Sequence, residues 1–397
     1  MKKSVAIIGG GAAGLLLAAF LDSSLFDITI YEKNKTFGRK LLVAGKGGFN
    51  LTHSEPIADL IQRYTPTNFL EEALLHFSNE DLRNWLETIG IPTFIGSSKR
   101  IYPKEDIKPI DVLSKILEVL KSKDVAFKFE HDWTGWNAKN ELIFENQEIV
   151  SSDYIVFALG GGSWKVTGSD GSWLDIFRKQ DIETIPFKPA NCAYQIEWNP
   201  DFLQKHSGSP LKNIAVTCGS KYQKGELVIT DFGLEGNAIY ALSPEIQSEL
   251  DSLGKATIYI DLKPSLTEED IKKRIENSNK KITETLSKDL NLSRLQINLI
   301  KDQLTKDEFL NTSVLASSIK ALEFNVLAPA QIDEAISTTG GIPLDQVDSN
   351  HMLKKLPDHY CIGEMLDWNA PTGGYLLQAC FSMGVHLASH INTSNKR

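Results

Sequence analysis

The chain has 397 residues, of which 42% are hydrophobic and 23% are charged, and its formal net charge is −9. This length exceeds one typical hydrophobic core, so two or three domains are expected, and the composition is ordinary for a soluble globular protein. The acidic balance argues against a nucleic-acid surface, which needs a basic patch, although it leaves room for a local one.

No feature of the sequence predicts export, a membrane span or a metal site. The apolar run after Met1 is interrupted by glycines and lacks a cleavage site, so we interpret it as part of the fold. No other stretch reaches the roughly 18 apolar residues of a transmembrane helix. Cys192, Cys218, Cys361 and Cys380 show neither CxxC nor zinc spacing, which favours reduced thiols in a cytoplasmic protein.

The first predicted elements are a strand, a tight turn and a helix over residues 5–19, and the turn reads Gly9-x-Gly11-x-x-Gly14. In such a turn the first glycine permits the sharp bend, the second lets the backbone approach a pyrophosphate, and the third lets the helix pack close to the strand. The helix N-terminus then offers unpaired N–H groups and partial positive charge to the phosphates. An ordinary α/β turn is the alternative.

A second strand over residues 26–31 supports the nucleotide interpretation, because it ends at an acidic residue. Glu32 follows Gly9 by 23 residues, close to the separation of about 20 expected for the acid that binds a ribose hydroxyl. The next segment, residues 34–52, is rich in glycine, Arg and Lys. We expect it to cover a ligand rather than to be a plain surface loop.

Residues 68–120 are predicted to be mainly helical. Apolar residues at helical spacing predict helices over 68–90 and 110–120. Residues 97–103 lie between them and are interpreted as a loop that faces water.

The pattern then changes to strands, over residues 125–129 and 142–144. A buried parallel strand is predicted over 154–159, and it runs directly into three glycines at 160–162. This arrangement fits a second close approach to the nucleotide, with a plain glycine turn as the alternative.

The composition changes again near Pro186. Short strand candidates follow at residues 193–196, 214–217, 226–230 and 257–261. They predict an antiparallel sheet or small barrel, which would cover the cofactor and shape a substrate cavity. Residues 264–324 combine dense charges with apolar residues at helical intervals, which predicts a small helical subdomain.

Glycine motifs return at residues 337–343, 360–367 and 371–380, and the last opens a C-terminal helix. The final two motifs repeat the N-terminal arrangement, in which a strand delivers the backbone and a helix N-terminus points its dipole at an electron-rich atom. A flavin ring, whose reduced form carries negative charge near N1 and O2, would be stabilised there. Glycine-rich sites at both ends of the chain suit a long cofactor better than a single phosphate.

In this order the motifs resemble those of the YhiN/BaiN-type family of FAD-binding oxidoreductases, over essentially the whole chain. The residues that carry the resemblance are Gly9-Gly10-Gly11-Ala12-Ala13-Gly14 with Glu32, Gly38-Arg39-Lys40-Leu41 through Thr52, Ala158-Leu159-Gly160-Gly161, Thr339-Gly340-Gly341, and Gly363-Glu364 through Tyr375. The resemblance implies an α/β fold with a discontinuous Rossmann-type FAD-binding domain, an inserted antiparallel, barrel-like β domain and a small helical domain. The expected limits are 1–187 with 336–397, 188–262 with 325–335, and 263–324.

The resemblance also implies which residues contact FAD. They are Gly9, Gly11, Ala12, Ala13, Gly14, Glu32, Lys33, Gly38, Arg39, Lys40, Leu41, Gly45, Gly47, Asn50, Leu51, Val125, Ala126, Ala158, Gly160, Gly161, Gly363, Glu364, Gly373, Gly374, Tyr375 and Leu376. The fingerprint glycines would meet the pyrophosphate, Glu32 the adenosine ribose, and the backbone of Val125 and Ala126 the adenine.

The remaining roles concern the other half of the cofactor. Arg39 and Lys40 would lie along it, Gly363 and Glu364 would meet the ribityl and pyrophosphate region, and residues 374–376 would lie at the flavin pyrimidine edge.

The chain departs from the family pattern at two places. Gly48 and Phe49 stand where the family usually has Arg-Cys, and Glu235-Gly236-Asn237 stands where it often has Ser-Gly-Pro. Both lie where substrate would meet the flavin, so a relative's substrate is not transferred to this chain.

These features predict a flavin redox enzyme whose FAD is reduced by NADH or NADPH, or by a small organic substrate. The absence of CxxC excludes a disulfide reductase of that type, and no second complete GxGxxG marks a dedicated NAD(P) domain. No catalytic acid or base is assigned, although His53 follows the glycine loop and is the nearest candidate. A tRNA-modifying flavoprotein and a non-catalytic nucleotide-binding protein are the alternatives. The expected partner is a small molecule, with neither nucleic acid nor membrane favoured.

Overall fold

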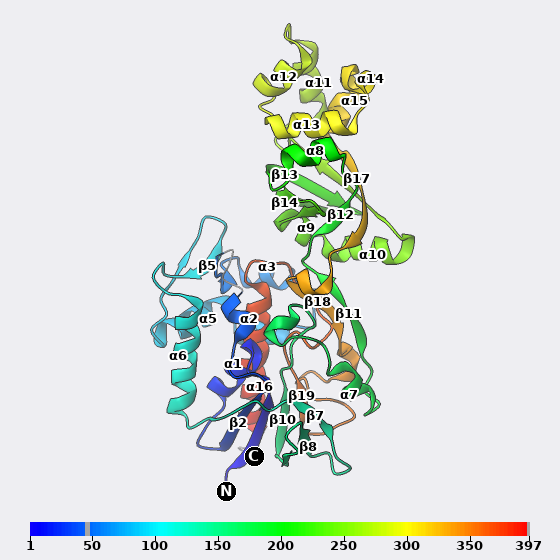
Figure 1. Ribbon diagram of the computed structural model, residues 1–397. Helices are drawn as coiled ribbons and strands as arrows, with labels where there is room; N and C mark the ends of the chain where they lie inside the picture. The colour runs from blue at the N-terminus through cyan, green and yellow to red at the C-terminus, as the bar shows by residue number, and fades with distance from the viewer. Residues whose placement is uncertain (44–47, 395–397) are drawn as a thin grey trace. The chain divides into compact units, whose positions relative to one another are not determined.

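The computed structural model describes residues 1–43 and 48–394. The chain divides into two compact units, Met1–Lys188 with Ser337–Arg397, and Pro189–Ile336 (Figure 1). The first contains a parallel sheet with helices, and the second contains a closed antiparallel barrel with helices. The predicted fold class is therefore confirmed.

The central sheet of the first unit has five parallel strands in the order β19-β10-β1-β2-β6. The strands are β1 (Lys3–Ile8), β2 (Phe26–Glu32), β6 (Ala126–Phe129), β10 (Tyr154–Phe157) and β19 (His359–Cys361). The inner strands β1 and β10 are almost continuously apolar and buried, as a parallel sheet covered on both faces requires.

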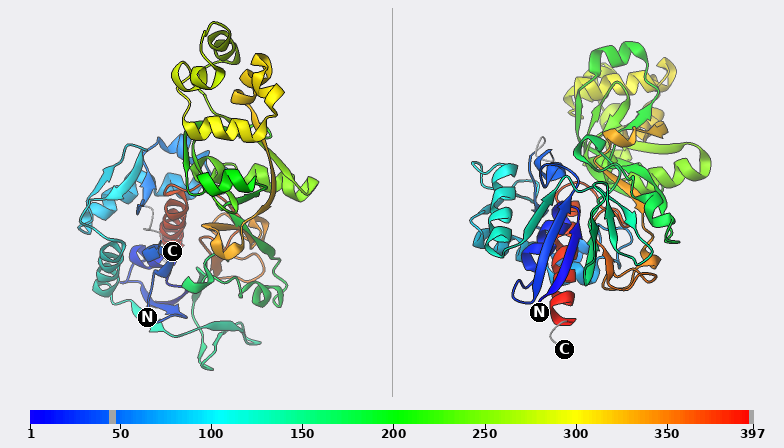
Figure 2. Two further views of the ribbon diagram at one scale, coloured as in Figure 1. Left: turned by 45° about the horizontal axis from the view of Figure 1, so that its top comes forward. Right: turned by 60° about the horizontal axis from the view of Figure 1, so that its bottom comes forward.

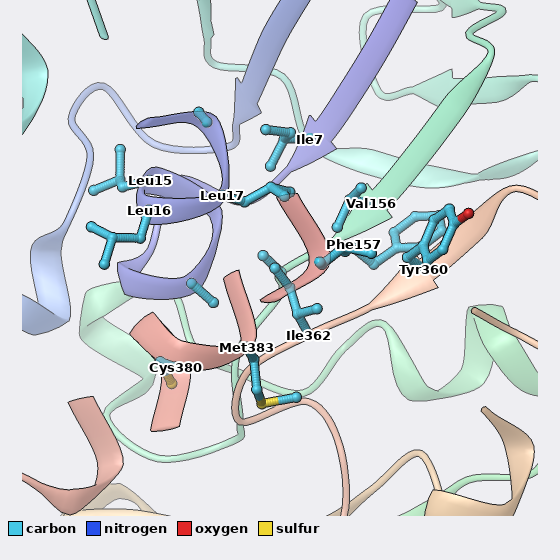
Figure 3. Close-up of a cluster of buried hydrophobic side chains, with 14 of the residues drawn as sticks. Ile7, Leu15, Leu16, Leu17, Val156, Phe157, Tyr360, Ile362, Cys380 and Met383 are labelled. Carbon is cyan, nitrogen blue, oxygen red and sulfur yellow. The ribbon is translucent and has the colours of Figure 1, made fainter. Parts of the chain in front are cut away.

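Two helices from opposite ends of the chain pack together against this sheet. They are α1 (Ala12–Phe20) and α16 (Tyr375–Ser394), and they run side by side (Figure 1). A Cβ at Gly384 would lie 2.6 Å from the carbonyl oxygen of Ala13, so only glycine allows the two backbones to approach this closely. Leu16, Met383 and Ile362 are among the side chains that fill the space between these elements (Figure 3). Burying each is worth about 1.5–3 kcal/mol.

The rest of the first unit consists of short helices and small sheets. The helices are α2 (Arg39–Val43), α3 (Ile57–Ile61), α4 (Glu71–His76), α5 (Asn79–Thr88), α6 (Pro109–Ser122), η2 (Lys165–Thr167), α7 (Leu174–Arg178) and η4 (Leu344–Gln346). The small sheets are β3 (Thr52–His53), β5 (Arg100–Pro103) and β4 (Thr93–Ile95); β7 (Trp133–Trp136), β8 (Leu142–Phe144) and β9 (Ile149–Val150); and β11 (Ile185–Ala190) with β18 (Ser337–Gly341).

Two sequence predictions in this unit are wrong in detail. The single helix expected over 68–90 is two helices, because Ser78 caps the N-terminus of α5 and forms a capping box with Asp81. The segment 97–103, expected to be a loop, contributes the central strand of the sheet β3-β5-β4. Its partners are distant in sequence, so no local pattern reveals the pairing.

The second unit is a closed barrel in the order β12-β15-β14-β13-β16-β17. The strands are β12 (Tyr194–Ile196), β13 (Pro210–Cys218), β14 (Lys221–Ile229), β15 (Gly233–Glu235), β16 (Ala256–Asp261) and β17 (Leu322–Pro329). Residues 322–327 alternate strictly between buried and exposed, so one face of β17 forms the barrel core. Closure removes the unpaired sheet edges.

The helices of this unit lie mainly between β16 and β17 in sequence and gather at one end of the barrel (Figure 2). Those between β16 and β17 are α11 (Glu268–Glu276), α12 (Ile282–Lys288), α13 (Arg294–Gln303), α14 (Lys306–Leu310) and α15 (Thr312–Lys320). Outside this stretch of sequence lie α8 (Pro200–His206), α9 (Asn237–Tyr240), α10 (Ser243–Leu253) and η3 (Ile332–Glu334). Capping boxes at Thr267, Ser293 and Thr305 begin three of them. In the part of the chain that the structure covers, no helix has the length and apolar character that crossing a membrane demands.

Candidate cofactor site

The turn between β1 and α1 lies at the carboxyl edge of the central sheet, and two of its fingerprint glycines are required by the protein's own packing. Gly9 has φ +109°, and a Cβ there would lie 2.3 Å from the carbonyl oxygen of Ala158. A Cβ at Gly14 would lie 2.3 Å from the carbonyl oxygen of Gly9. Both residues are therefore glycine because the strands and α1 approach one another closely.

The remaining fingerprint glycine, Gly11, has a different environment. A Cβ at Gly11 would meet no atom of the described residues within 4 Å, and its backbone at φ −86° and ψ −173° suits any residue. Gly11 also occupies the N-cap of α1 without a capping side chain. The protein itself does not require glycine here, whereas a pyrophosphate that approaches the helix N-terminus does. This open cradle fits FAD.

Glu32, at the end of β2, is fixed beside this turn. Its Oε2 accepts a hydrogen bond from the Gly10 N–H at 3.0 Å, and its Oε1 accepts from the Asn34 N–H at 2.9 Å and from Asn34 Nδ2 at 2.7 Å. A carboxylate has about four acceptor positions, so Glu32 keeps capacity for a ribose hydroxyl. The carboxylate is oriented before any ligand arrives.

Two of the predicted cofactor residues, Lys33 and Arg39, are positively charged and bind a loop of the protein itself. Lys33 forms an ion pair of 3.0 Å with Asp170, and Arg39 donates to Asn34 Oδ1 at 2.6 Å and to the Val166 carbonyl at 2.9 Å. Both interactions connect the segment after β2 with the loop that follows β10. These two residues therefore order the rim of the site in this structure.

Lys40 joins the N-terminal and C-terminal glycine motifs. Its Nζ donates to Ser163 Oγ at 2.9 Å and lies 3.5 Å from Glu364 Oε2. Glu364 follows Gly363, where φ is +82° and a Cβ would lie 3.2 Å from the Cβ of Ala13. The end of β19 therefore reaches the first turn of α1, as the predicted shared site requires.

The remaining predicted residues of segment 38–51 divide into exposed and buried positions. Gly38 has φ +62° and donates its N–H to the Gly10 carbonyl at 2.9 Å, which brings this segment to the fingerprint turn. Leu41 and Leu51 are buried in the core, so only their backbones are available to a cofactor, whereas Asn50 is partly exposed. Gly45 and Gly47 lie outside the described residues.

The glycines after β10 are explained by contacts within the first unit. Ala158 is buried and donates its N–H to the Ile8 carbonyl at 2.8 Å. A Cβ at Gly161 would lie 2.3 Å from Thr338 Oγ1, and Gly160 has φ +73°. These positions line the same edge as the fingerprint turn but are constrained by the protein itself.

The predicted adenine contact at Val125 and Ala126 requires a correction. Ala126 is paired with Thr29 and Phe129 with Glu32, so Val125 and Ala126 lie at the amino end of β6. That end is three residues, about 10 Å, from the level of Glu32 along the strand. Phe129 lies level with Glu32, and the His131 N–H donates to the Glu32 carbonyl at 3.0 Å, so residues 129–131 lie closer to Glu32 than Val125 and Ala126 do.

In the C-terminal motif, two glycines let the backbone pass close to another segment of the chain. Gly373 and Gly374 have φ +119° and +99°, and a Cβ at Gly374 would lie 2.6 Å from the Cα of Thr52. This turn leads directly into α16, which begins at Tyr375, and Leu376 is partly buried in its first turn. The N-terminus of a 20-residue helix is thereby packed directly on β3.

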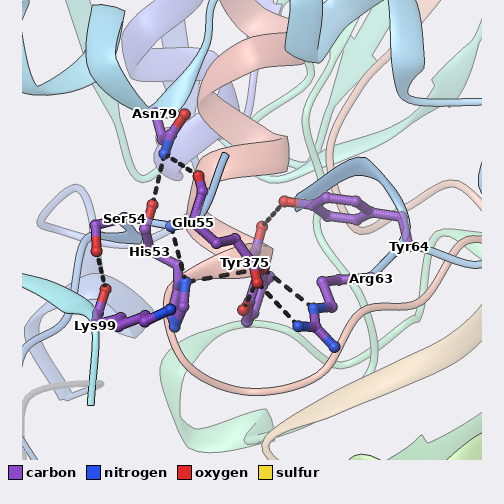
Figure 4. Close-up of polar contacts among 8 residues, drawn as sticks. All are labelled: His53, Ser54, Glu55, Arg63, Tyr64, Asn79, Lys99 and Tyr375. Carbon is purple, nitrogen blue, oxygen red and sulfur yellow. Dashed lines mark hydrogen bonds and ion pairs between the residues drawn. The ribbon is translucent and has the colours of Figure 1, made fainter. Parts of the chain in front are cut away.

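The Tyr375 side chain points toward a polar cluster that sequence analysis missed (Figure 4). Its hydroxyl donates to Glu55 Oε1 at 2.6 Å, and Arg63 donates to both Glu55 oxygens at 3.1 and 2.9 Å. Burial raises the pKa of Glu55, but the hydrogen bonds from Arg63 and Tyr375 outweigh it and hold the pKa below its usual value. Glu55 is therefore a buried carboxylate that stays ionised. Its partner Tyr375 is 320 residues away along the chain, so no local motif marks it.

His53 belongs to the same cluster. Its Nδ1 accepts from the Glu55 N–H at 3.3 Å, and its ring stacks on Tyr375 with centroids 5.2 Å apart. Burial lowers its pKa, against the opposing charge of Glu55, which favours the neutral ring. Its Nδ1 and one face of its ring are therefore engaged within the cluster.

Metal and thiol chemistry have no assembled site within residues 1–43 and 48–394. No group of three or more His, Cys, Asp or Glu in these ranges has the geometry to hold a metal ion. Cys192, Cys218, Cys361 and Cys380 are free and buried, and burial raises the pKa of the Cys192 thiol to about 11.

The parallel sheet, the open cradle at Gly11 and the fixed Glu32 define a Rossmann-type flavoprotein that binds FAD and has oxidoreductase relatives. The chain belongs to the HI0933-like family, because the model described as "HI0933-like protein Rossmann domain" matches residues 3–390. The family resemblance drawn from the motifs is thus confirmed.

Two relatives are similar over nearly their whole length. A 3-dehydro-bile acid delta(4,6)-reductase from Clostridium scindens is 24% identical, with 96% of this chain and 97% of that protein covered. A ribosomal RNA dihydrouridine synthase from Haemophilus influenzae is also 24% identical, with 97% and 98% covered. Among solved structures, a 3-ketosteroid-delta4-(5alpha)-dehydrogenase from Rhodococcus jostii RHA1 is 10% identical with a TM-score of 0.46, covering 98% of this chain and 97% of that one.

Proposed function

We propose that this protein is an FAD-dependent reductase whose flavin is reduced by NADH or NADPH, or by a small organic substrate. The single observation that carries the proposal is the open cradle at Gly11, where glycine is needed for a ligand and not for the fold. Glu32, held at the side of that cradle, supplies the acceptor for an adenosine ribose.

In this proposal the chain binds and orients, and FAD, when bound, supplies hydride and electron transfer. The N-terminus of α1 at Gly11 would hold the pyrophosphate, and Gly363 and Lys40 would hold the middle of the cofactor. The N-terminus of α16, behind Gly374, would offer the positive end of its dipole to the ring.

The names of the two relatives support a reductase and suggest the class of substrate. A delta(4,6)-reductase and a dihydrouridine synthase are both named for adding hydrogen to carbon–carbon double bonds. In a 3-dehydro steroid and in uracil such a double bond is conjugated to a carbonyl group. We therefore assign this chain a substrate with an activated double bond of that kind.

The first test is the absorbance spectrum of the purified protein, followed by anaerobic addition of NADH or NADPH. Flavin bands that bleach establish a nicotinamide-driven reductase and justify screening conjugated enones as acceptors. Bands that persist point instead to a flavin reduced by an organic substrate. Protein that remains colourless after incubation with FAD, with no thermal shift, would refute the proposal and favour a non-catalytic nucleotide-binding protein.

A second candidate function is reduction of a uridine in RNA, favoured by the relative named for ribosomal RNA. The net charge of −9 weighs against a general RNA surface. The test is to incubate ribosomal RNA with the protein and NADPH, hydrolyse it to nucleosides and measure dihydrouridine by mass spectrometry. Dihydrouridine above the level of a Gly11→Val control, together with salt-dependent RNA binding, would replace the small-molecule proposal.

A further inference from the structure

Glu55 is a buried ionised group outside the part of the site that the sequence motifs mark. Its side chain is 6% exposed and accepts hydrogen bonds from two nitrogens of Arg63, whose own side chain is 47% exposed. Burying a carboxylate is costly unless it is paired and hydrogen-bonded. The fold retains this charge, and its remaining bond goes to Tyr375 (Figure 4).

The cluster holds the first residue of α16 from two directions. The Tyr375 hydroxyl donates to Glu55, while the Tyr375 carbonyl accepts a hydrogen bond from the buried Tyr64 hydroxyl at 2.9 Å. Asn79 fixes the other side by donating to the backbone carbonyls of His53 and Glu55 at 2.7 and 3.0 Å. Side chain and backbone of Tyr375 are therefore both tied to the segment 53–64.

The turn before Tyr375 has no room to adjust by itself. A Cβ at Gly374 would lie 2.6 Å from the Cα of Thr52, and a Cβ at Gly373 would lie 3.2 Å from Arg100 Nε. The backbone at 373–374 is thus pressed against β3 and β5. A shift of Tyr375 would be transmitted to this turn and to the first amides of α16.

We infer that Glu55, clamped by Arg63, is a positioning residue for the flavin-ring half of the cofactor site, and that it acts through the Tyr375 hydroxyl on the first turn of α16. The inference rests on the proposed function, since it places the ring in front of Gly374. It separates two contributions to FAD affinity: the cradle at Gly11 binds the ADP half, and the Glu55 cluster shapes the site for the ring. Loss of the cluster should weaken FAD without weakening ADP.

The test compares FAD and ADP affinities of the flavin-free protein, because ADP carries the adenosine and pyrophosphate but no ring. In Tyr375→Phe, FAD should bind about 3- to 10-fold more weakly, the range of one ordinary hydrogen bond, because the lost bond acts on FAD only through the turn before α16, while ADP affinity stays within about 2-fold. Tyr194→Phe is the matched control. Tyr194 is also buried, and its hydroxyl contacts the Ser243 carbonyl at 3.4 Å in the barrel unit, so both affinities should remain at wild-type values.

A second pair of variants tests Glu55 directly. Glu55→Gln retains an acceptor for Tyr375 and should keep the ratio of FAD to ADP affinity closer to wild type than Glu55→Ala does. Equal weakening of FAD and ADP in Tyr375→Phe would show a merely structural role and overturn the inference, as would unchanged affinity for both. Wild-type protein that binds ADP but not FAD would instead refute the proposed function, and the inference with it.

Discussion

The two halves of the candidate site are built by different means. At the ADP half, Gly9, Gly11 and Gly14 arrange backbone atoms and a helix N-terminus within one continuous stretch of sequence. At the ring half, Glu55 and Arg63 hold Tyr375 by side-chain hydrogen bonds, across 320 residues in the case of Glu55 and Tyr375. The first half is local in sequence and consists mainly of backbone groups beside Glu32, whereas the second is long-range and depends on a buried carboxylate.

The two halves should tolerate different kinds of substitution. A backbone cradle is sensitive to added atoms and insensitive to charge, because its donors are N–H groups that do not titrate. A side-chain cluster is sensitive to the loss of a single hydroxyl or charge, because a buried partner is then left unsatisfied. Substitutions in the two halves should therefore separate cleanly in their effects on ADP, on FAD and on folding.

The largest expected effect is on the cradle. In Gly11→Val the added Cβ meets no atom of the described residues within 4 Å, so the apoprotein should melt close to the wild-type temperature. FAD and ADP should both lose about 3 kcal/mol or more of binding free energy, roughly 100-fold, through overlap with the pyrophosphate. Differential scanning fluorimetry and ligand titration measure the two quantities. Stoichiometric flavin retained by this variant would show that the fingerprint is misplaced.

Gly14→Val is the counterpart that sharpens this result. Its Cβ would lie 2.3 Å from the Gly9 carbonyl oxygen, a backbone atom that cannot move without distorting β1. We expect the free energy of unfolding to fall by about 3 kcal/mol, at the upper end of overpacking costs. Chemical denaturation of the apoproteins checks this, and equal stability of the Gly11 and Gly14 variants would contradict the distinction drawn between them.

A smaller effect is expected at Glu32, which belongs to the ADP half although it acts through a side chain. Glu32→Gln retains one acceptor oxygen but removes the charge, so FAD and ADP should both bind about 10-fold more weakly. The ratio of the two affinities should stay at the wild-type value, in contrast to Tyr375→Phe. A variant with weaker FAD binding and unchanged ADP binding would contradict the assignment of Glu32 to the ADP half.

The same contrast explains how much could be predicted from the sequence. The fingerprint turn and Glu32 form a local pattern, and the structure brings Gly9, Glu32 and Gly363 to one edge of the sheet as expected. The β6 strand was also predicted. However, the residue of β6 that lies level with Glu32 depends on register between distant strands, so the sequence could not show that Val125 and Ala126 lie at the amino end of β6, away from Glu32.

The Glu55 cluster of the ring half escaped prediction for a related reason, although residues 374–376 were predicted. Segment 97–103 has the composition of a loop, and only its pairing with β3 and β4 makes Arg100–Pro103 a strand. Glu55 resembles an ordinary surface carboxylate until Arg63 and Tyr375 are placed beside it. His53 looked like the nearest acid or base because it follows the glycine loop, yet its Nδ1 and its ring face are already engaged. The spacing of residues in the sequence cannot show that these contacts are already made.

The smallest effect near neutral pH comes from a buried histidine near α16, which should make the stability of this unit depend on pH. His351 is 2% exposed, lies beside Phe69 and His386, and has no hydrogen-bond partner for either ring nitrogen among the described residues. Burial lowers its pKa to about 3, and repulsion from His386 and His390 adds to the shift.

The folded state thus keeps His351 neutral, while the unfolded chain takes up a proton near pH 6.5, so stability is lost as pH falls below about 6.5. The expected loss is about 0.8 kcal/mol at pH 6 and about 1.4 kcal/mol for each further pH unit. In His351→Asn, whose side chain tolerates the φ of +67°, this part of the pH dependence should disappear. Urea denaturation of both proteins from pH 7.5 to 5 measures it. Parallel curves would mean that water reaches the ring and that burial does not exclude the proton.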